Sequence, residues 1–300
     1  SIPELLAVSY DNDGITIGAS VPINSVIQIL TDANKSTPDK TSAFPSLADH
    51  LSNIATVGIR NVGSWAGNLM IARYHPQFPS DILTTMTAIG ATLTILSETS
   101  TIKISINDFP NFQFLPTQLL GSIKIPYTLQ NQIFYSIKIK ARHQMSHPIV
   151  NAAFMMNYAA QSAPTIASMN IVYGGVVPSP LMPKKTMDYL VNKPLTASTM
   201  TNALQILATE CIPIQLKTSV NYLSSHPQYI TNICINLFYR FFVTQLSLAG
   251  IVIPNNKQSL LKTYIRPISS GTETYSSDEK EKPVSYPITK LEAYQQCSGE

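Results

Sequence analysis

Apolar and polar residues alternate with two different periods along the first third of the chain. After the turn dipeptide Asp13-Gly14, apolar residues occupy every second position of residues 15–19, which predicts a β-hairpin. Further on, apolar residues recur at the spacing of a helix face, behind polar residues that suit helix N-caps. The predicted elements are helices beginning at Asn24 or Ser25, at Ser46 and at Ser80-Asp81, and paired strands at 92–96 and 101–106.

The middle of the chain predicts strands, and the part after Gly174-Gly175 predicts helices. The expected strands cover 119–125, 133–140, 149–159 and 165–173, and the expected helices cover 200–211 and 228–248. A break near residues 128–132 divides the chain, and after Val252 the composition changes to a polar tail. These patterns together predict an α+β protein with a loose C-terminal tail.

Composition and charge exclude several functional classes. The 300 residues are 44% hydrophobic and 12% charged, which provides enough apolar material for a large core. The net charge is only +3, whereas nucleic-acid binders usually carry a concentrated basic face, so no nucleic-acid partner is expected. Cys211, Cys234 and Cys297 are widely spaced, which argues against a disulfide scaffold or a metal centre held by cysteines.

No segment of the sequence predicts export or insertion into a membrane. Residues 1–30 carry acidic residues and no basic start, so a signal peptide is not expected. The most apolar stretch, residues 230–249, contains Arg240 and several amides that are costly in lipid, and it predicts a buried helix. We therefore expect a cytoplasmic protein without a membrane partner. Because the chain starts at Ser1 rather than Met, we also expect it to be part of a longer protein.

Residues 59–68, IRNVGSWAGN, are the part of the sequence best suited to binding a ligand. Two glycines four residues apart let the backbone approach a ligand, and successive N–H groups in such a turn can converge on a pyrophosphate. Ser64 adds a neutral donor, and Arg60 can neutralise phosphate charge. The alternative is a glycine-containing loop that packs around Trp65, the only tryptophan. The spacing of the glycines matches neither the dinucleotide-binding nor the P-loop pattern, so spacing alone favours this alternative.

This segment, followed by Phe78-Pro79-Ser80-Asp81, resembles the FAD-binding domain of the xanthine dehydrogenase and aldehyde oxidase family, the molybdenum hydroxylases. Similar stretches follow in the family's order along nearly the whole chain. They are Ile2–Leu5 with Asp13-Gly14-Ile15 and Gly18-Ala19, LLGSIKIPY at 119–127, Lys138 with Ala141-Arg142, VYGG at 172–175, PVSYPI at 283–288 and QQCSGE at 295–300. Their collinear order carries the resemblance.

The resemblance implies a fold class and a domain organisation. The chain would be α+β, with the second lobe of a PCMH-type (vanillyl-alcohol-oxidase-like) FAD-binding domain followed by a CO-dehydrogenase-flavoprotein C-terminal-like α+β subdomain. The lobe would span residues 1–130, the C-terminal flavoprotein domain 131–250, and a linker leading to a molybdenum-cofactor domain 251–300. The family's first FAD lobe, with its Gly-Asn-Thr phosphate loop, would precede Ile2. We therefore expect these residues alone to bind FAD weakly and to be inactive.

The resemblance also implies a set of residues that contact FAD. They are Ile54, Ser64, Trp65, Ala66, Gly67, Asn68, Asp81, Leu120 and Lys138. The backbone of residues 64–68 would hold the pyrophosphate, and Asp81 would accept hydrogen bonds from sugar or ribityl hydroxyls. Ile54 and Leu120 would offer apolar surface to the rings. Lys138 would place positive charge near the isoalloxazine and favour reduced, anionic flavin. No catalytic or metal-binding residue is expected in this chain.

The implied parent is an oxidoreductase that passes electrons between several centres. Electrons from substrate oxidation at molybdenum would pass through 2Fe–2S clusters to FAD, and then to NAD or dioxygen. The ligands of the clusters and of molybdopterin would lie in iron–sulfur and molybdenum domains outside this chain. Relatives imply a homodimer. The sequence does not choose between purine, aldehyde and other heterocyclic substrates.

Several positions depart from the family pattern and motivate a rival hypothesis. Trp65 and Ala66 stand where relatives carry Val or Ile and then Gly, and residues 73–77 lengthen the loop before Asp81. A third departure concerns the electron acceptor: residues 143–147 lack the acidic residues that relatives place near the flavin, so the sequence does not choose between NAD and dioxygen. The rival is a non-catalytic remnant or interaction module that keeps the fold without flavin. A stand-alone oxidase of the vanillyl-alcohol oxidase type is disfavoured, because the final residues lead towards a molybdenum domain.

The histidines offer one further pattern. His143 and His147 have the i, i+4 spacing of some zinc sites, but the surrounding residues do not predict a helix and Pro148 follows at once. A metal site is therefore disfavoured. His50, His75 and His226 are isolated in the sequence, and we expect each to be a structural residue whose hydrogen bonds are satisfied.

Overall fold

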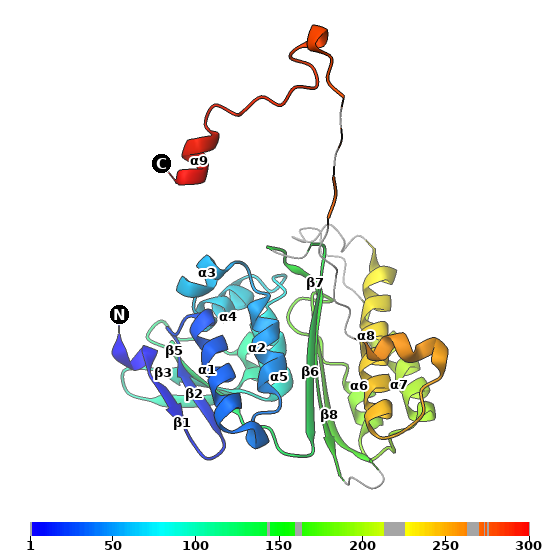
Figure 1. Cartoon of the computed structure of the whole chain (residues 1–300). Helices are drawn as coiled ribbons and strands as arrows, with labels where there is room; N and C mark the ends of the chain where they lie inside the picture. Colours follow the sequence, from blue (N-terminus) through cyan, green and yellow to red (C-terminus); the bar gives the residue numbers. More distant parts are fainter. Residues whose placement is uncertain are drawn as a thin grey trace. The chain divides into compact units, whose positions relative to one another are not determined.

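A computed structural model describes residues 2–142, 145–159, 164–212, 226–262, 270–272, 274 and 276–299. The chain divides into two compact units, residues 1–261 and 262–300. The first unit contains two antiparallel sheets and the helices that pack on them (Figure 1). His143, which belongs to the disfavoured metal pair, lies outside the described residues.

The first sheet has five strands and joins two hairpins. In spatial order they are β1 (Val8–Tyr10), β2 (Gly14–Gly18), β5 (Leu119–Pro126), β3 (Thr92–Leu96) and β4 (Thr101–Ser105). The predicted hairpin at Asp13-Gly14 is confirmed, with β1 and β2 antiparallel and the Asp11 N–H donating to the Gly14 carbonyl at 2.9 Å. Strand β5 pairs with β2 on one side and with β3 on the other, so it joins the two hairpins into one sheet.

Five helices accompany this sheet, and we call the sheet and these helices the first domain. They are α1 (Ile23–Ser36), α2 (Phe44–Ser52), α3 (Val57–Val62), α4 (Trp65–Tyr74) and α5 (Asp81–Ile89). The predicted Ser80 N-cap is confirmed, because its hydroxyl accepts a hydrogen bond from the Leu83 N–H at 3.0 Å. The predicted Ser46 cap is wrong: α2 begins at Phe44 with Pro45 in its first turn, which is a favoured position for proline.

The second sheet has three strands and is covered on both faces. They are β6 (Gln132–Lys140), β7 (Pro148–Tyr158) and β8 (Ile166–Gly174), paired in that order. Along β7, Ala153 and Met155 join the core shared with the first domain, whereas Phe154 and Met156 join a second core. Burial on both faces explains why β7 is an almost continuous apolar run rather than an alternating one.

Three helices build the second core. They are α6 (Lys184–Leu190), α7 (Ala197–Glu210) and α8 (Pro227–Leu248). The sheet β6–β8 lies between them and the helices of the first domain (Figure 1). The aromatic residues of α8 pack on β7, with the rings of Phe238 and Phe241 centred 6.2 and 5.0 Å from that of Phe154. In the described part of the chain, no helix is long and apolar enough to cross a membrane.

Short helices complete the two units. In the first unit they are η1 (Pro3–Leu6), η2 (Pro38–Lys40), η3 (Ile106–Asn111) and η5 (Asn255–Leu261), and in the second they are η6 (Glu279–Glu281) and α9 (Ala293–Ser298). No described residue of the second unit is buried, which agrees with the polar composition of this part of the sequence.

Candidate functional site

A largely apolar cleft of about 720 Å³ lies where the α2–α3 connection, the start of α4 and strand β6 meet. It is lined by Ile23, Ile54, Ala55, Thr56, Ile59, Gly63, Ser64, Gly67, Asn68, Ile71, Phe78, Asp81, Lys138, Met145, Ser146 and His147. Of the residues predicted to contact FAD, the cleft brings together Ile54, Ser64, Gly67, Asn68, Asp81 and Lys138. These residues are distant in sequence, so the fold itself gathers them.

The first turn of α4 opens on this cleft. Ser64 is its N-cap, and the Ser64 Oγ accepts a hydrogen bond from the Gly67 N–H at 3.1 Å. A Cβ at position 67 would lie 3.3 Å from that hydroxyl, so glycine suits the close cap. The first turn of a helix also carries N–H groups without acceptors inside the helix and the positive end of its dipole. This end of α4 is therefore suited to an anionic group.

The segment 64–68 is thus a helix start and not an open loop. The Trp65 side chain is 1% exposed, and its Nε1–H donates to the Gly18 carbonyl at 2.7 Å. Ala66 is 7% exposed, and neither side chain lines the cleft. Trp65 is therefore a packing residue, as the alternative hypothesis predicted for its side chain. Contact with a ligand remains available through the backbone of this turn.

Asp81 is the centre of a buried polar cluster at the edge of the cleft. Its Oδ2 accepts from the Lys138 ammonium at 2.9 Å, and its Oδ1 accepts from the Asn151 amide at 3.2 Å. His50 Nε2 lies 3.1 Å from the same Oδ1. Burial acts to raise the pKa of Asp81, but the hydrogen bond and charge of His50, together with Lys138, hold that pKa below its ordinary value.

Lys138 does not carry a free charge towards the cleft. Its side chain is 4% exposed, and its ammonium bonds the Asn53 carbonyl at 3.0 Å as well as Asp81. On the same face of β6, the Lys140 ammonium bonds the Asn53 Oδ1 at 2.5 Å. The positive charge expected from Lys138 is therefore largely balanced by Asp81, and it is held against the end of α2.

His50, Asn53 and Asn151 belong to the site although the sequence did not single them out as site residues. His50 is 2% exposed, and within the described residues its Nδ1 has no hydrogen-bond partner. The expectation of a fully satisfied histidine at this position is therefore wrong. Because an ionised Asp81 can only accept, the hydrogen bond between them requires a proton on His50 Nε2. The family resemblance pointed to Asp81 and Lys138, and nothing local in the sequence indicated their neighbours in this cluster.

Leu120 lies outside the cleft. It is 7% exposed on β5, opposite Ile95, and belongs to the core of the first domain. Its predicted contact with flavin rings thus has no counterpart among the residues that line the cleft. Ile54, the other predicted apolar contact, does line it.

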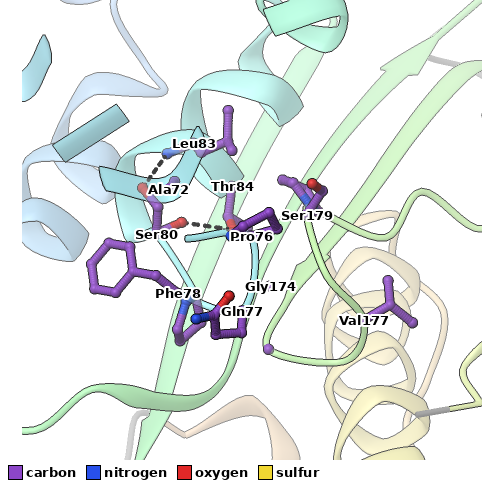
Figure 2. A pocket seen from close by; sticks show the side chains of 13 residues that line it. Ala72, Pro76, Gln77, Phe78, Ser80, Leu83, Thr84, Gly174, Val177 and Ser179 are labelled. Atoms are coloured by element: carbon purple, nitrogen blue, oxygen red, sulfur yellow. Dashed lines mark hydrogen bonds between the residues drawn. The ribbon is translucent and has the colours of Figure 1, made fainter. Parts of the chain in front are cut away.

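A second hollow, beside Ser80 and Gly174, is too small for an organic ligand (Figure 2). Its volume is about 10 Å³, which is room for about one water molecule. The Ser80 hydroxyl next to it donates to the Asn68 Oδ1 at 2.6 Å and caps α5, as Figure 2 shows for the bond from Leu83. This junction therefore ties α4 to α5 and is part of the support of the larger cleft.

The remaining histidine of the cleft has an aromatic neighbour. His147 packs edge-on against Phe78, with ring centroids 5.5 Å apart. Within the described residues, no group of three or more His, Cys, Asp or Glu side chains could hold a metal ion.

Comparison with known families covers most of the chain. Residues 1–128 match the family described as the FAD binding domain in molybdopterin dehydrogenase. Residues 135–245 match the CO dehydrogenase flavoprotein C-terminal domain. The two matches follow one another in the order that the resemblance in the sequence implied, so that resemblance is confirmed.

Curated relatives match the chain from end to end. They include the indole-3-acetaldehyde oxidases of Zea mays and Arabidopsis thaliana, with 28% and 27% identity, and aldehyde oxidase 2 of Rattus norvegicus, with 24%. All of this chain is covered in each case, but only 22% of the two plant proteins and 23% of the rat protein. The chain thus spans less than a quarter of the length of these relatives.

Solved structures share the fold. Carbon monoxide dehydrogenase from Hydrogenophaga pseudoflava superimposes with a TM-score of 0.65 at 18% identity, over 80% of this chain and 77% of that one. Quinoline 2-oxidoreductase from Pseudomonas putida 86 gives 0.62 at 19% identity, over 83% and 80%. The α+β fold class is therefore confirmed for the greater part of the chain.

Proposed function

The chain carries the FAD-binding and C-terminal flavoprotein domains of the molybdenum hydroxylase family, and we propose that it holds FAD in the cleft beside α4. The observation that carries this proposal is the meeting of three features in one cleft. The first turn of α4 suits a pyrophosphate, apolar walls suit flavin rings, and the Asp81–Lys138 pair supplies polar groups at the edge. The residues present therefore fit the cofactor.

The predicted contacts keep their proposed roles with some changes of detail. Ser64, Gly67 and Asn68 would surround the phosphates, and Trp65 and Ala66 would contribute backbone only. Ile54 would face the rings, whereas Leu120 would act from the core behind the cleft. FAD supplies the capacity to accept and pass on electrons. Lys138 and Asp81 would hold a fixed, nearly neutral charge pair beside it, and the second lone pair of the Asp81 Oδ2 would serve a sugar or ribityl hydroxyl.

We further propose that this segment works inside a larger oxidoreductase of the xanthine dehydrogenase and aldehyde oxidase kind. Electrons would arrive from 2Fe–2S clusters and leave to NAD or dioxygen. Iron–sulfur and molybdopterin domains would be its partners in the parent chain, in a cytoplasmic homodimer. The proposed domains are residues 1–130, 131–250 and 251–300. The names of the relatives, aldehyde and indole-3-acetaldehyde oxidases, support an oxidoreductase.

A flavin titration of the 300-residue chain tests the binding. FAD fluorescence and the emission of Trp65 would be followed while FAD, and separately riboflavin, is added. We expect saturable binding that is weak, in the micromolar range or above, with FAD bound more tightly than riboflavin because of the α4 turn. Sub-micromolar affinity would contradict the expected weakness. A full-length parent that purifies colourless would overturn the proposal and support the remnant hypothesis, which the end-to-end matches do not favour.

A further inference from the structure

Arg60 is a buried cation with an incomplete set of partners. The residue is 8% exposed on α3, and its Nη1 donates to the Ile54 carbonyl at 2.6 Å. Its Nε is buried and has no partner in the part of the chain that the structure describes. No described carboxylate lies within ion-pair distance of it. A guanidinium stays charged at every relevant pH, so a buried one calls for an anionic partner.

Two more cations reach Asn53, the neighbour of Ile54, through its backbone carbonyl or its side chain. The Lys138 ammonium bonds the Asn53 carbonyl, the Lys140 ammonium bonds the Asn53 Oδ1, and Arg60 bonds the next carbonyl, that of Ile54. Burial and the charge of Lys138 lower the pKa of Lys140, as expected where like charges crowd. Three basic side chains from two elements thus converge on residues 53–54.

The described anions do not balance these charges. Asp81 pairs with Lys138 and also contacts His50, so it is already committed. Asp49, whose charge also acts on Lys140, is exposed to solvent and therefore screened. The carboxyl end of α2 offers roughly half a negative charge. A surplus of positive charge is left on the side of Arg60.

This surplus faces a hollow of its own, which we call the Arg60 pocket. It has a volume of about 400 Å³ and is lined by Ser52, Asn53, Ala55, Thr56, Val57, Arg60 and Met145. Ala55, Thr56 and Met145 also line the larger cleft, so the two hollows are contiguous. Ala55 adopts φ 45°, a left-handed conformation that is unfavourable for alanine, at the edge that they share.

We propose that the Arg60 pocket binds a phosphate group, with the Arg60 guanidinium as its buried cation and Asn53 and Thr56 as polar walls. A phosphate offers several acceptor oxygens to a guanidinium that has one hydrogen bond in the described structure. Two sources share this chemistry. One is a phosphate of the flavin nucleotide in the contiguous cleft, and the other is a separate molecule that bears a phosphate.

Titration of the full chain with inorganic phosphate tests the site, by calorimetry and phosphorus NMR with ionic strength held constant by chloride. We expect saturable binding to the wild type and at least about tenfold weaker binding to Arg60→Gln, because a charge-assisted bond is lost. Arg60→Lys, which keeps the charge, should bind with intermediate affinity. The matched control is Arg73→Gln: Arg73 also donates to backbone carbonyls, those of Phe109 and Pro110, but lies outside the pocket.

Two results would overturn the proposal: no saturable phosphate binding by the wild type, or equal affinity of the wild type and a folded Arg60→Gln. If Arg60→Gln does not fold, Arg60→Lys provides the second test, and a phosphate affinity equal to that of the wild type would count against the site. The source is assigned by repeating the titration with FAD or riboflavin present. If FAD prevents phosphate binding and riboflavin does not, the pocket takes the flavin's own phosphates. If phosphate still binds in the presence of either flavin, the pocket takes a separate ligand. If FAD does not bind at all, the titration with inorganic phosphate still tests the Arg60 pocket.

Discussion

Lys138 and Asp81 form a buried ion pair that connects the second sheet to helix α5, with the Lys138 Nζ 2.9 Å from the Asp81 Oδ2 and the two side chains 4% and 8% exposed. Lys138 lies on β6 of the second sheet, whereas Asp81 begins α5 of the first domain. The pair therefore holds the two sides of the cleft together and sets the local charge. Both residues line the cleft, so a ligand can reach them. Each charge is balanced by the other when no ligand is bound.

Replacing Asp81 by Asn should strongly destabilise the protein. The variant keeps the shape but leaves the Lys138 ammonium buried without a counter-charge, which costs about 3–5 kcal/mol of unfolding free energy. Urea unfolding followed by circular dichroism measures this cost. The control is Asp188→Asn in the exposed Lys184–Asp188 pair, which should change stability little. A double variant, Asp81→Asn with Lys138→Met, should recover part of the loss, and a strictly additive result would contradict the coupling.

The same carboxylate gives the protein a predictable dependence on pH. The folded state lowers the pKa of Asp81 below the ordinary 3.8, so its contribution to stability is fully present above that value. The contribution is lost as the pH falls from there through the lowered pKa of the folded state. The difference in stability between wild type and Asp81→Asn, measured over an acid titration, should therefore shrink below pH 3.8. A difference that grows on acidification would show a raised pKa instead.

The periodic parts of the fold could be predicted because burial dictates them. The alternation after Asp13-Gly14 marks a hairpin, and the apolar run at 149–159 marks a strand buried on both faces. The aromatic residues of the helix that contains Phe238 follow from the same rule. Each of these patterns arises because several neighbouring residues share one pattern of burial, so the local sequence is enough to predict it.

The composition of the site could be predicted only in part. The resemblance led to Ser64, Asp81 and Lys138, but nothing local indicates that His50 and Asn151 meet at Asp81. Their contacts depend on how α2 and β7 pack on α5, which is a property of tertiary structure. The helical start of α4 was missed for another reason: glycines in a short segment suggest a turn, whereas the Ser64 cap and the burial of Trp65 favour a helix.

Removing the Ser64 hydroxyl should weaken both α4 and flavin binding. Ser64→Ala loses the cap on the Gly67 N–H, at a cost of about 1 kcal/mol in unfolding free energy. Because the same turn faces the cleft, FAD affinity should fall as well. Thr196→Ala is the matched control, since it removes the N-cap of α7, whose hydroxyl accepts from the Thr199 N–H at 3.2 Å. Helix α7 packs in the second core and contributes no residue to the lining of the cleft. Equal losses of FAD affinity in the two variants would show that stability alone is responsible.

The three cysteines should react very differently with a thiol reagent. Cys297 is exposed, whereas Cys211 at the C-terminal end of α7 and Cys234 within α8 are fully buried. A hydrogen bond with Cys211 and burial raise the pKa of the Cys234 thiol well above its ordinary value, which disfavours the reactive thiolate. We expect only Cys297 to be modified quickly in the native protein, and all three after unfolding in urea. Fast modification of Cys234 in the native state would indicate that the α7–α8 core opens.

Gly174 should tolerate no side chain, because it makes room for the amide that supports Asp81. A Cβ at this position would collide with the Asn151 Oδ1 and lie 2.6 Å from the Thr84 Oγ1. The Asn151 Oδ1 accepts from that hydroxyl at 3.1 Å while its Nδ2 donates to Asp81, so a shift of the amide breaks both bonds. Gly174→Ala should therefore destabilise the protein by about 1–3 kcal/mol, as other overpacked cores are.

The control for this change is Gly58→Ala on the exposed side of α3, where the nearest atom to the new Cβ is the Thr56 Oγ1 at 3.9 Å. Alanine is favoured over glycine inside a helix, so this variant should be neutral or gain about 0.5–1 kcal/mol. Urea unfolding measures both variants, and FAD titration of Gly174→Ala should show weaker binding, since Asp81 loses one of its donors. If Gly174→Ala is as stable as the wild type, Asn151 can leave Asp81 at little cost, and the polar cluster is less tightly coupled than its geometry indicates.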